Sequence, residues 1–235
     1  MTTGGSRLAL AVAILAVAPA PAWAGCIEVG LTQDEARAAA VRPGASRTYF
    51  VQDAVPVRGC PNDTPACRAR AFLVPGDVVL LGTTQGNYTC AAFTNTHGVT
   101  TIGWLPTAAI MPLPSSTPAL GDWAGHWSAP EQDITIKSGQ AGSLAIKGDA
   151  TWGMGDPDRV RRGGIHTGEI SGETLPVGGV VSFAMGDDGT LPYDEGDDTI
   201  CRVRMLRRGP YLIVKDNNQC GGANVTFSGI YRRKG

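Results

Sequence analysis

The sequence predicts an all-β protein built from two small antiparallel domains. Two observations support this fold class. First, 32 glycines and 16 prolines among 235 residues interrupt the chain too often for a helical bundle. Second, the segments between them are short and rich in β-branched and aromatic side chains, which is the composition of strands. A chain of this length fits one or two domains.

The composition is that of a folded and nearly neutral protein. Hydrophobic residues make up 43% of the chain and charged residues only 17%, so enough apolar surface is available to build cores. The net charge of −1 argues against a broad binding surface for nucleic acid or for anionic lipid. The sequence contains no apolar run long enough to span a bilayer, so we expect no membrane span.

Residues 1–24 are predicted to be a signal peptide. Arg7 is the only charge before an apolar run at residues 8–18, and this run is too short for a membrane helix. Ala22-Trp23-Ala24 fits an A-x-A cleavage site, so we expect the mature chain to begin at Gly25. The protein is therefore expected in the periplasm or outside the cell.

A lipoprotein signal is the alternative, because Cys26 follows the cleavage site closely. Such signals usually place leucine three residues before the lipidated cysteine, where this chain has Trp23. Lipidation of Cys26 would also leave one of the other five cysteines without a partner. We therefore favour cleavage near Ala24 without lipidation.

The six cysteines are predicted to form three disulfides, because an exported chain meets an oxidising compartment. A zinc site would need paired C-x-x-C or Cys/His spacing, whereas Cys60 and Cys67 are seven residues apart with no histidine near them. We expect no metal and no cofactor. The predicted pairs are Cys60–Cys67, Cys201–Cys220 and, by elimination, Cys26–Cys90.

Three prolines between residues 112 and 118 predict a stiff, extended linker. We therefore expect a first domain at residues 25–111, a linker at 112–120 and a second domain at 121–235. The first domain is predicted to open with a short helix at residues 32–41, capped by Thr32 and Glu35 and ended by Pro43 and Gly44. The strands expected after it are residues 48–51, 54–58, 71–74, 78–81, 87–93 and 100–105.

Four motifs of the first domain occur in the order found in the bacterial SH3-like domain, which this part of the chain resembles over residues 49–112. They are Val57-Arg58-Gly59-Cys60-Pro61, Leu73-Val74-Pro75-Gly76-Asp77-Val78-Val79, Tyr88 where the family often has tryptophan, and Gly103-Trp104-Leu105-Pro106. The resemblance implies a small SH3-like barrel. The loops at residues 60–67 and 95–100 depart from the family pattern.

The resemblance also implies a binding role, since bacterial SH3-like domains often bind cell-wall peptides or dock on proteins. SH3-like barrels hold extended peptides against aromatic side chains. We therefore take Tyr49, Arg58, Tyr88 and Trp104 as the candidate ligand-binding residues. The alternative is that the aromatic rings, together with Phe72, fill a small core, and that Arg58 pairs with an acidic neighbour at the surface.

The second domain is predicted to contain about eight antiparallel strands, some of which alternate apolar and polar residues as Ile134-Thr135-Ile136-Lys137 does. A hairpin of residues 201–205 and 211–214 would bring Cys220 back to Cys201. Gly125-His126-Trp127 and Arg232-Arg233 resemble the lipocalin and related calycin pattern, in which a late arginine covers the tryptophan. The resemblance implies a barrel that can hold a small ligand. Another antiparallel barrel or sandwich is the alternative.

The sequence offers weak support for catalysis. Cys201 has a predicted disulfide partner, and only His166 has a possible metal-binding neighbour, Glu169, leaving His97 and His126 unplaced. A G-x-S-x-G motif is absent. The acidic residues between 187 and 198 are expected to form a solvated loop, with a calcium site as the alternative.

These observations predict an exported, non-enzymatic binding protein of the bacterial cell envelope. Its SH3-like domain would dock on cell-wall peptide or on an envelope protein. The main alternative is a periplasmic inhibitor of a lysozyme or protease that acts through the loops at residues 60–67 and 187–198. A hydrolase that uses His166 and a carrier of a small apolar ligand are two further hypotheses.

Overall fold

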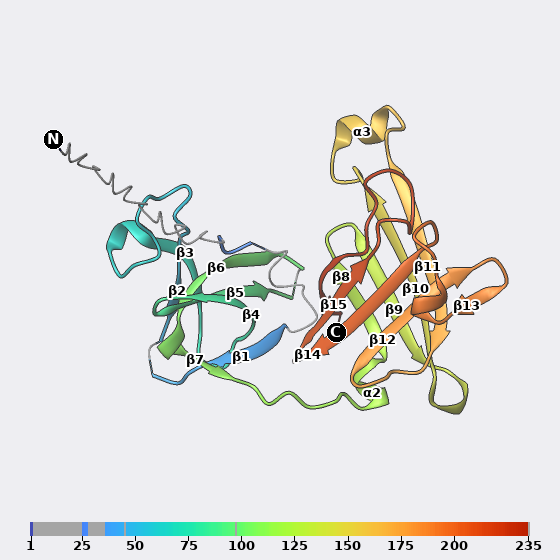
Figure 1. Ribbon diagram of the computed structural model, residues 1–235, viewed down its shortest axis with the longest axis horizontal. Coiled ribbons are helices and arrows are strands. Elements are labelled where there is room, and N and C mark those ends of the chain that lie inside the picture. Colours follow the sequence, from blue (N-terminus) through green and yellow to red (C-terminus); the bar gives the residue numbers. More distant parts are fainter. Residues whose placement is uncertain (2–24, 28–35, 45, 97, 235) are drawn as a thin grey trace.

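The computed structural model describes residues 1, 25–27, 36–44, 46–96 and 98–234 (Figure 1). These residues form two antiparallel sheets, one of seven strands and one of nine, with only short helices. The predicted all-β fold class is therefore confirmed. The sheets lie side by side, and the segment between them passes along one edge of the molecule (Figure 1).

The seven-stranded sheet has the strand order β3-β2-β6-β5-β4-β1-β7. Its core contains three large, fully or nearly fully buried side chains, Phe50, Leu73 and Leu105. Its strands are β1 (Arg37–Val41), β2 (Thr48–Val51), β3 (Arg68–Leu73), β4 (Val78–Gln85), β5 (Tyr88–Thr94), β6 (Thr100–Pro106) and β7 (Ile110–Pro112).

Two predictions for this part of the chain were wrong. Residues 37–41, the second half of the predicted helix, form strand β1, while Thr32 and Glu35 lie outside the described residues. Ala39 is fully buried and lies opposite Val79 and Pro112, so pairing on both sides overrides the helix propensity of an alanine run. Residues 54–58 form turns instead of a strand.

The nine-stranded sheet has the order β11-β10-β9-β8-β16-β15-β14-β12-β13 and curls into a nearly closed barrel. Two hydrogen bonds link the first strand of this order to the last two and so nearly close the barrel. Thr174 Oγ1 donates to the carbonyl of Ser182 at 3.4 Å, and the Glu173 N–H donates to Thr190 Oγ1 at 2.9 Å. Its strands are β8 (Gly125–Ala129), β9 (Gln132–Ser138), β10 (Leu144–Trp152), β11 (His166–Thr174), β12 (Val180–Gly186), β13 (Gly189–Leu191), β14 (Arg202–Arg208), β15 (Tyr211–Asp216) and β16 (Gly229–Arg233).

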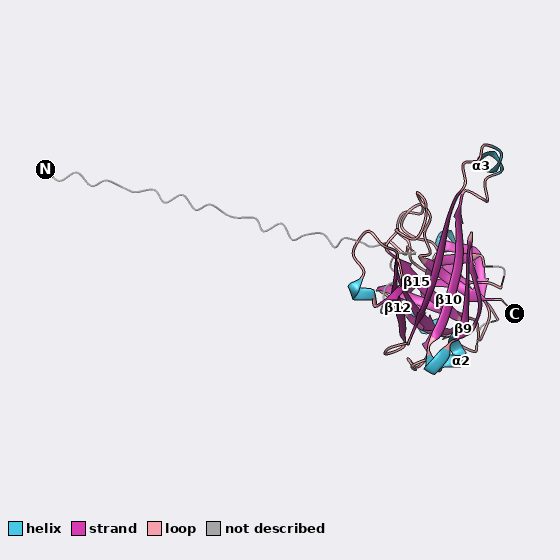
Figure 2. Cartoon of the chain, turned by 90° about the vertical axis from the view of Figure 1, so that its right-hand side faces the viewer, coloured by secondary structure: helices cyan, strands magenta, loops and turns pink. Residues whose placement is uncertain are grey.

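Two short helices accompany the barrel, α2 (Leu120–Trp123) and α3 (Pro157–Arg161). They lie toward opposite ends of it, and α3 stands clear of the strands (Figure 2). Among the described residues, every helix is too short or too polar to cross a membrane.

Alternation along the strands packs the interior of the barrel with apolar side chains. Ile134 and Ile136 are buried, whereas Thr135 between them is half-exposed. Trp127, Phe183 and Tyr231 are fully buried in the same core. The guanidinium carbon of Arg233 lies 5.1 Å from the centre of the Trp127 ring. A late arginine of the chain therefore lies against this tryptophan.

One outer side of the barrel is also buried, because it packs against the first sheet. Along β15, Leu212 and Val214 face the barrel interior, while Tyr211 and Ile213 join a core that includes Leu80 and other residues of the first sheet. The Tyr211 hydroxyl donates a hydrogen bond to the carbonyl of Val78. The two sheets therefore share one hydrophobic core.

The structure contains the three predicted disulfides. Their Cα–Cα distances are 5.2 Å for Cys26–Cys90, 5.6 Å for Cys60–Cys67 and 4.6 Å for Cys201–Cys220, all within the usual range. The Cys26–Cys90 disulfide links residue 26 to β5, and Cys201–Cys220 closes the segment that contains the β14–β15 hairpin. The disulfides suggest an oxidising environment, which is consistent with an exported protein.

Candidate functional site

The candidate site is a shallow hollow on the first sheet that includes Tyr49. It has a volume of about 320 Å³ and is bounded by strands β2 and β3, by the loop that the Cys60–Cys67 disulfide closes, and by the end of β6. We call it the Tyr49 groove. Its lining residues are Arg47, Thr48, Tyr49, Val51, Asn62, Asp63, Thr64, Arg68, Pro106 and Ala109.

The floor of the Tyr49 groove is formed where β2 pairs with β3. Tyr49 lies opposite Phe72, and their ring centres are 5.8 Å apart. The register between β2 and β3 shifts between Tyr49 and Val51, and after the shift Val51 lies opposite Arg68. The sheet thus places a half-buried tyrosine beside an exposed arginine.

Two arginines cover these aromatic rings. The guanidinium carbon of Arg47 is 4.3 Å from the Phe72 ring centre, and that of Arg68 is 4.9 Å from the Tyr49 ring centre. Both distances fit cation–π contacts. Phe72, which lies next to Tyr49 and is not one of the lining residues, is still 41% exposed, so the arginines leave aromatic surface beside the groove open to a ligand.

Hydrogen bonds within the Cys60–Cys67 loop shape the opposite wall. The Asn62 side chain donates to the carbonyl of Gly59 at 2.9 Å and accepts from the N–H of Thr64 at 2.8 Å. Asp63 accepts a hydrogen bond from the hydroxyl of Tyr88. Burial raises the pKa of Tyr88 to about 12, and the hydrogen bond and negative charge of Asp63 add to this rise.

The four candidate ligand-binding residues occupy different environments. Tyr49 lines the groove. Tyr88 lies beneath its wall and is only 8% exposed, and its hydroxyl holds Asp63 in place. Arg58 is exposed in the turn before Cys60 and is not one of the residues that line the hollow.

Trp104 is fully buried in the shared core, where it lies opposite Val51 and Cys90 on the neighbouring strands. A ring without exposed surface cannot contact a docked peptide. Its Nε1 has no hydrogen-bond partner among the described residues. Trp104 therefore fills the core, which is the alternative stated above, and it is not one of the residues that line the groove.

The electrostatics of the Tyr49 groove favour a negatively charged group. Arg47 and Arg68 contribute two positive charges, and Arg70 is exposed farther along β3. Asp63 is the acidic residue of the lining, and its carboxylate already accepts a hydrogen bond from the Tyr88 hydroxyl. Guanidinium groups bind carboxylates through paired hydrogen bonds, while the rings supply apolar contact.

Cys201 and His166, the candidates for catalysis, have other partners. Cys201 forms a disulfide. The His166 ring is hydrogen-bonded to the carbonyl of Ala223 and lies against the Trp152 ring. His97 is outside the described residues. Within the described part of the chain, no group of three histidine, cysteine or acidic residues is placed to hold a metal ion. In the acidic loop, Asp197 accepts hydrogen bonds from the side chain and backbone of Thr199, which lower its pKa.

One polar group was not anticipated from the sequence. On the outer face of β8 and β9, the two ring nitrogens of His126 each lie 3.1 Å from a side-chain oxygen, one of Asp133 and one of Thr135. Lys234 Nζ lies 3.0 Å from the same Asp133 oxygen. Period-two alternation, which places Asp133 and Thr135 on one face, could have indicated it. About 45% of the Asp133 side chain is exposed, so this is an open surface network.

Comparison of the chain with protein-family models, with curated proteins and with solved structures finds no match.

Proposed function

We propose that this protein is an exported, non-enzymatic binding protein whose Tyr49 groove docks an extended peptide that carries a carboxylate. The observation that supports the proposal is the contact of two arginines that line the groove with two aromatic rings, Tyr49 in the groove and Phe72 beside it. Rings give apolar contact area, and guanidinium groups add carboxylate recognition. Cell-wall peptide and an acidic segment of an envelope protein both have this chemistry.

The position of the groove suits an extended ligand. β3 is at the edge of the seven-stranded sheet, so a peptide strand can add to its free backbone while side chains enter the groove. The Cys60–Cys67 disulfide and the Tyr88–Asp63 hydrogen bond hold the facing loop. A wall fixed before binding reduces the entropy that the complex loses.

Co-sedimentation with purified sacculi, followed by titration with soluble wall peptides, tests the proposal. Tyr49→Ala and Arg68→Gln should each weaken binding about tenfold, because they remove the ring and the charge that face the ligand. Tyr193→Ala is the matched control, since Tyr193 is also half-buried beside an arginine, Arg202, but lies in the barrel. Binding that is unchanged in both groove variants would contradict the proposal.

The choice between wall peptide and protein depends on the same variants. If the sacculi do not bind, capture of envelope proteins by the full chain is compared with capture by Tyr49→Ala. A protein that binds the full chain and Tyr193→Ala, but not Tyr49→Ala, assigns the groove to a protein partner. An absence of Tyr49-dependent binding in both assays would contradict docking at this site.

A second candidate function, inhibition of a hydrolase, is favoured by the loop between β10 and β11. Residues 153–165 of this loop, which include α3, project beyond the barrel (Figure 2). The Glu131 carboxylate accepts from the N–H groups of Gly153 at 3.2 Å and Gly155 at 2.5 Å. Asp156 caps α3, and Arg159 lies 4.0 Å from the ring centre of Trp152. These contacts tie the loop to the β8–β9 turn and to the end of β10.

This loop also presents apolar side chains, since Met154 is 50% exposed and Val160 is 43% exposed. A rigid projecting loop with apolar residues suits insertion into an active-site cleft. We would assay a panel of lysozymes and proteases with the full chain and with Met154→Ser/Val160→Ser. Inhibition that the double variant loses supports this function, and full residual activity across the panel would eliminate it.

A further inference from the structure

The outer face of strand β3 carries three exposed side chains in a row, beside the Tyr49 groove. They are Arg68, Arg70 and Phe72, and we call them the β3 stripe. Ala69 and Ala71 between them are half-buried and pack against the core. Because side chains two residues apart in a strand point to the same side of the sheet, the three exposed ones share one face. β3 is the first strand in the order of its sheet, so the stripe lies at an edge.

Contacts with the β2 side of the sheet orient the two ends of the stripe. The Phe72 ring lies 5.8 Å from the Tyr49 ring, centre to centre, and the guanidinium carbon of Arg47 is 4.3 Å from the Phe72 ring centre. The guanidinium carbon of Arg68 is 4.9 Å from the Tyr49 ring centre. A cation–π contact positions an arginine without neutralising its charge. Both arginines therefore keep their charge available to an anion.

The positive charge of this edge is not balanced by the chain itself. Within the described part of the chain, no ion pair joins Arg47, Arg68 or Arg70 to a carboxylate. Arg70 has no hydrogen bond or ring contact there either. Asp63, the carboxylate of the neighbouring groove, accepts a hydrogen bond from Tyr88. Like charges gathered at one edge repel one another, so the field of the three arginines favours an acidic partner.

The spacing of the stripe fits an extended peptide. Side chains two residues apart in a strand are about 7 Å apart, so the stripe extends about 13 Å from Arg68 to Phe72. An extended peptide has the same repeat, and alternate side chains of five successive residues can therefore face the three positions. Two carboxylates separated by one residue match the arginines, and an apolar side chain at the next alternate position matches the phenylalanine. Adjacent carboxylates do not match, because they point to opposite sides of an extended chain.

We propose that the β3 stripe selects an acidic strand of a protein partner, with two carboxylates separated by one residue and an apolar side chain at the next alternate position. The central carboxylate pairs with Arg70 and the outer one with Arg68, while the apolar side chain covers Phe72. This inference rests on the proposed function and narrows its ligand from any peptide with a carboxylate to one with this alternation. Arg70 thereby determines specificity, although it does not line the groove.

NMR titration of the ¹⁵N-labelled full chain with synthetic pentapeptides, at constant ionic strength, tests the alternation. Both ends of each peptide are blocked, so only side chains carry charge. The sequences are Glu-Thr-Glu-Thr-Leu, its reverse, and the isomer Glu-Glu-Thr-Thr-Leu. We expect saturable shifts at Arg68, Arg70 and Phe72 with the alternating peptide in at least one direction, and about three- to fivefold weaker binding of the isomer. Absence of saturable shifts, or equal affinities for the isomer and the alternating peptides, would overturn the proposal.

An exchange of charges tests Arg70 itself, whose exposed position lets it be replaced without disturbing the core. Arg70→Gln should weaken binding of the alternating peptide about three- to fivefold. Arg37→Gln is the matched control, because it removes an exposed arginine from β1 of the same sheet, and it should bind like the unmodified chain. Arg70→Glu should bind a peptide with lysine in place of the central glutamate more tightly than the unmodified chain does. Unchanged affinity in Arg70→Gln, or no gain from the exchange, would contradict the assignment.

The outcomes separate this inference from the proposed function. Peptide binding that is lost in Tyr49→Ala but unchanged in Arg70→Gln overturns the selection by the stripe and leaves the groove as the binding site. Binding that depends on Arg70 but not on Tyr49 supports the stripe and contradicts docking in the groove. A titration with oligothymidylate covers the other anionic chain that arginines and aromatic rings bind. Saturation by this oligonucleotide, with no response to any peptide, would assign the surface to nucleic acid and overturn the proposal.

Discussion

The phenol of Tyr211 in the barrel donates a hydrogen bond to the backbone carbonyl of Val78 in the first sheet. This bond joins elements that are 133 residues apart in the chain. Tyr211 is fully buried, and beside it Gly209 at the hairpin tip approaches Val78, where an added Cβ would lie only 3.3 Å from the valine side chain. The β14–β15 hairpin of the barrel therefore packs closely against the first sheet.

Replacement of Tyr211 by phenylalanine should destabilise the protein by about 0.5–1.5 kcal/mol, because the hydrogen bond to the half-buried Val78 carbonyl is lost. Chemical denaturation followed by tryptophan fluorescence measures this change. Tyr49→Phe is the control. This tyrosine is half-buried in the groove, so removal of its hydroxyl should lower the free energy of unfolding by less than about 0.5 kcal/mol. Equal stabilities of the two variants would contradict the role given to the Tyr211–Val78 bond.

Stability should also fall at alkaline pH, partly because of Tyr211. Burial is the main cause that raises its pKa from 10.0 to about 12, so the folded state retains this proton more strongly than the unfolded state. The contribution is fully present below pH 10 and is lost as the pH rises toward 12. Unfolding free energies measured between pH 9 and 11 should decline less steeply in Tyr211→Phe. If the unfolding free energies of the unmodified chain and of Tyr211→Phe decline equally with pH, Tyr211 makes no such contribution.

Gly125 gives Arg233 the space to reach Trp127. Its φ is +148°, and an added Cβ would lie 2.8 Å from Nε of Arg233. Gly125→Ala should therefore destabilise the barrel by about 1–3 kcal/mol. Gly121→Ala, where an added Cβ meets open space, should change stability by less than about 1 kcal/mol.

A double variant separates the collision from the backbone strain at Gly125. In Gly125→Ala/Arg233→Ala the collision is absent, so the combined loss of stability should be smaller than the sum of the two single losses. Thermal unfolding of the four proteins gives the comparison. Additive losses would show that the approach of Arg233 is not what requires glycine.

The three disulfides should contribute unequally to stability. The linked cysteines are 64, 19 and 7 residues apart in Cys26–Cys90, Cys201–Cys220 and Cys60–Cys67. Chain entropy alone gives about 4, 3 and 2.5 kcal/mol in that order, since a longer loop restricts the unfolded chain more. Pairwise replacement by alanine, followed by chemical denaturation, tests the order. A larger loss for Cys60–Cys67 than for Cys26–Cys90 would contradict it.

Local signals in the sequence determined much of this protein. Alternation in Ile134-Thr135-Ile136-Lys137 corresponds to strand β9, because side chains on a half-buried sheet repeat every two residues. The β-branched and aromatic run at residues 48–51 corresponds to strand β2. The number and spacing of the cysteines also led to the three disulfides that the structure contains. Tyr49 was named as a candidate, and it lines the groove.

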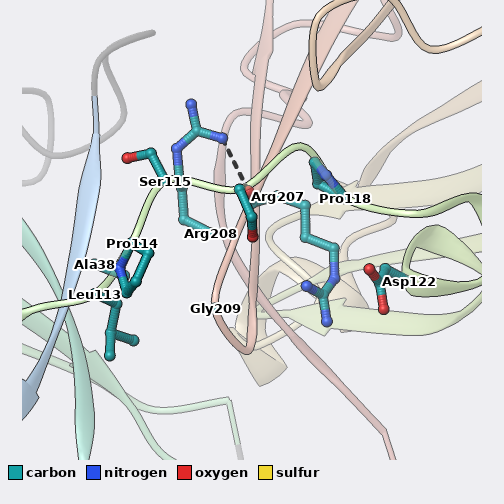
Figure 3. A pocket seen from close by; sticks show the side chains of 10 residues that line it. Ala38, Leu113, Pro114, Ser115, Pro118, Asp122, Arg207, Arg208 and Gly209 are labelled. Atoms are coloured by element: carbon teal, nitrogen blue, oxygen red, sulfur yellow. Dashed lines mark hydrogen bonds between the residues drawn. The ribbon is translucent and has the colours of Figure 1, made fainter.

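Only the tertiary structure decided the features that depend on distant partners. The strand Arg37–Val41 exists because β4 and β7 pair with it, and Trp104 is covered by a core that both sheets build. Residues 211–214 were predicted only as one strand of a hairpin, and it is the structure that shows the first sheet covering the outer side chains Tyr211 and Ile213. The cavity where the linker crosses the β14–β15 hairpin (Figure 3) also needs α2, because its walls come from segments far apart in the sequence.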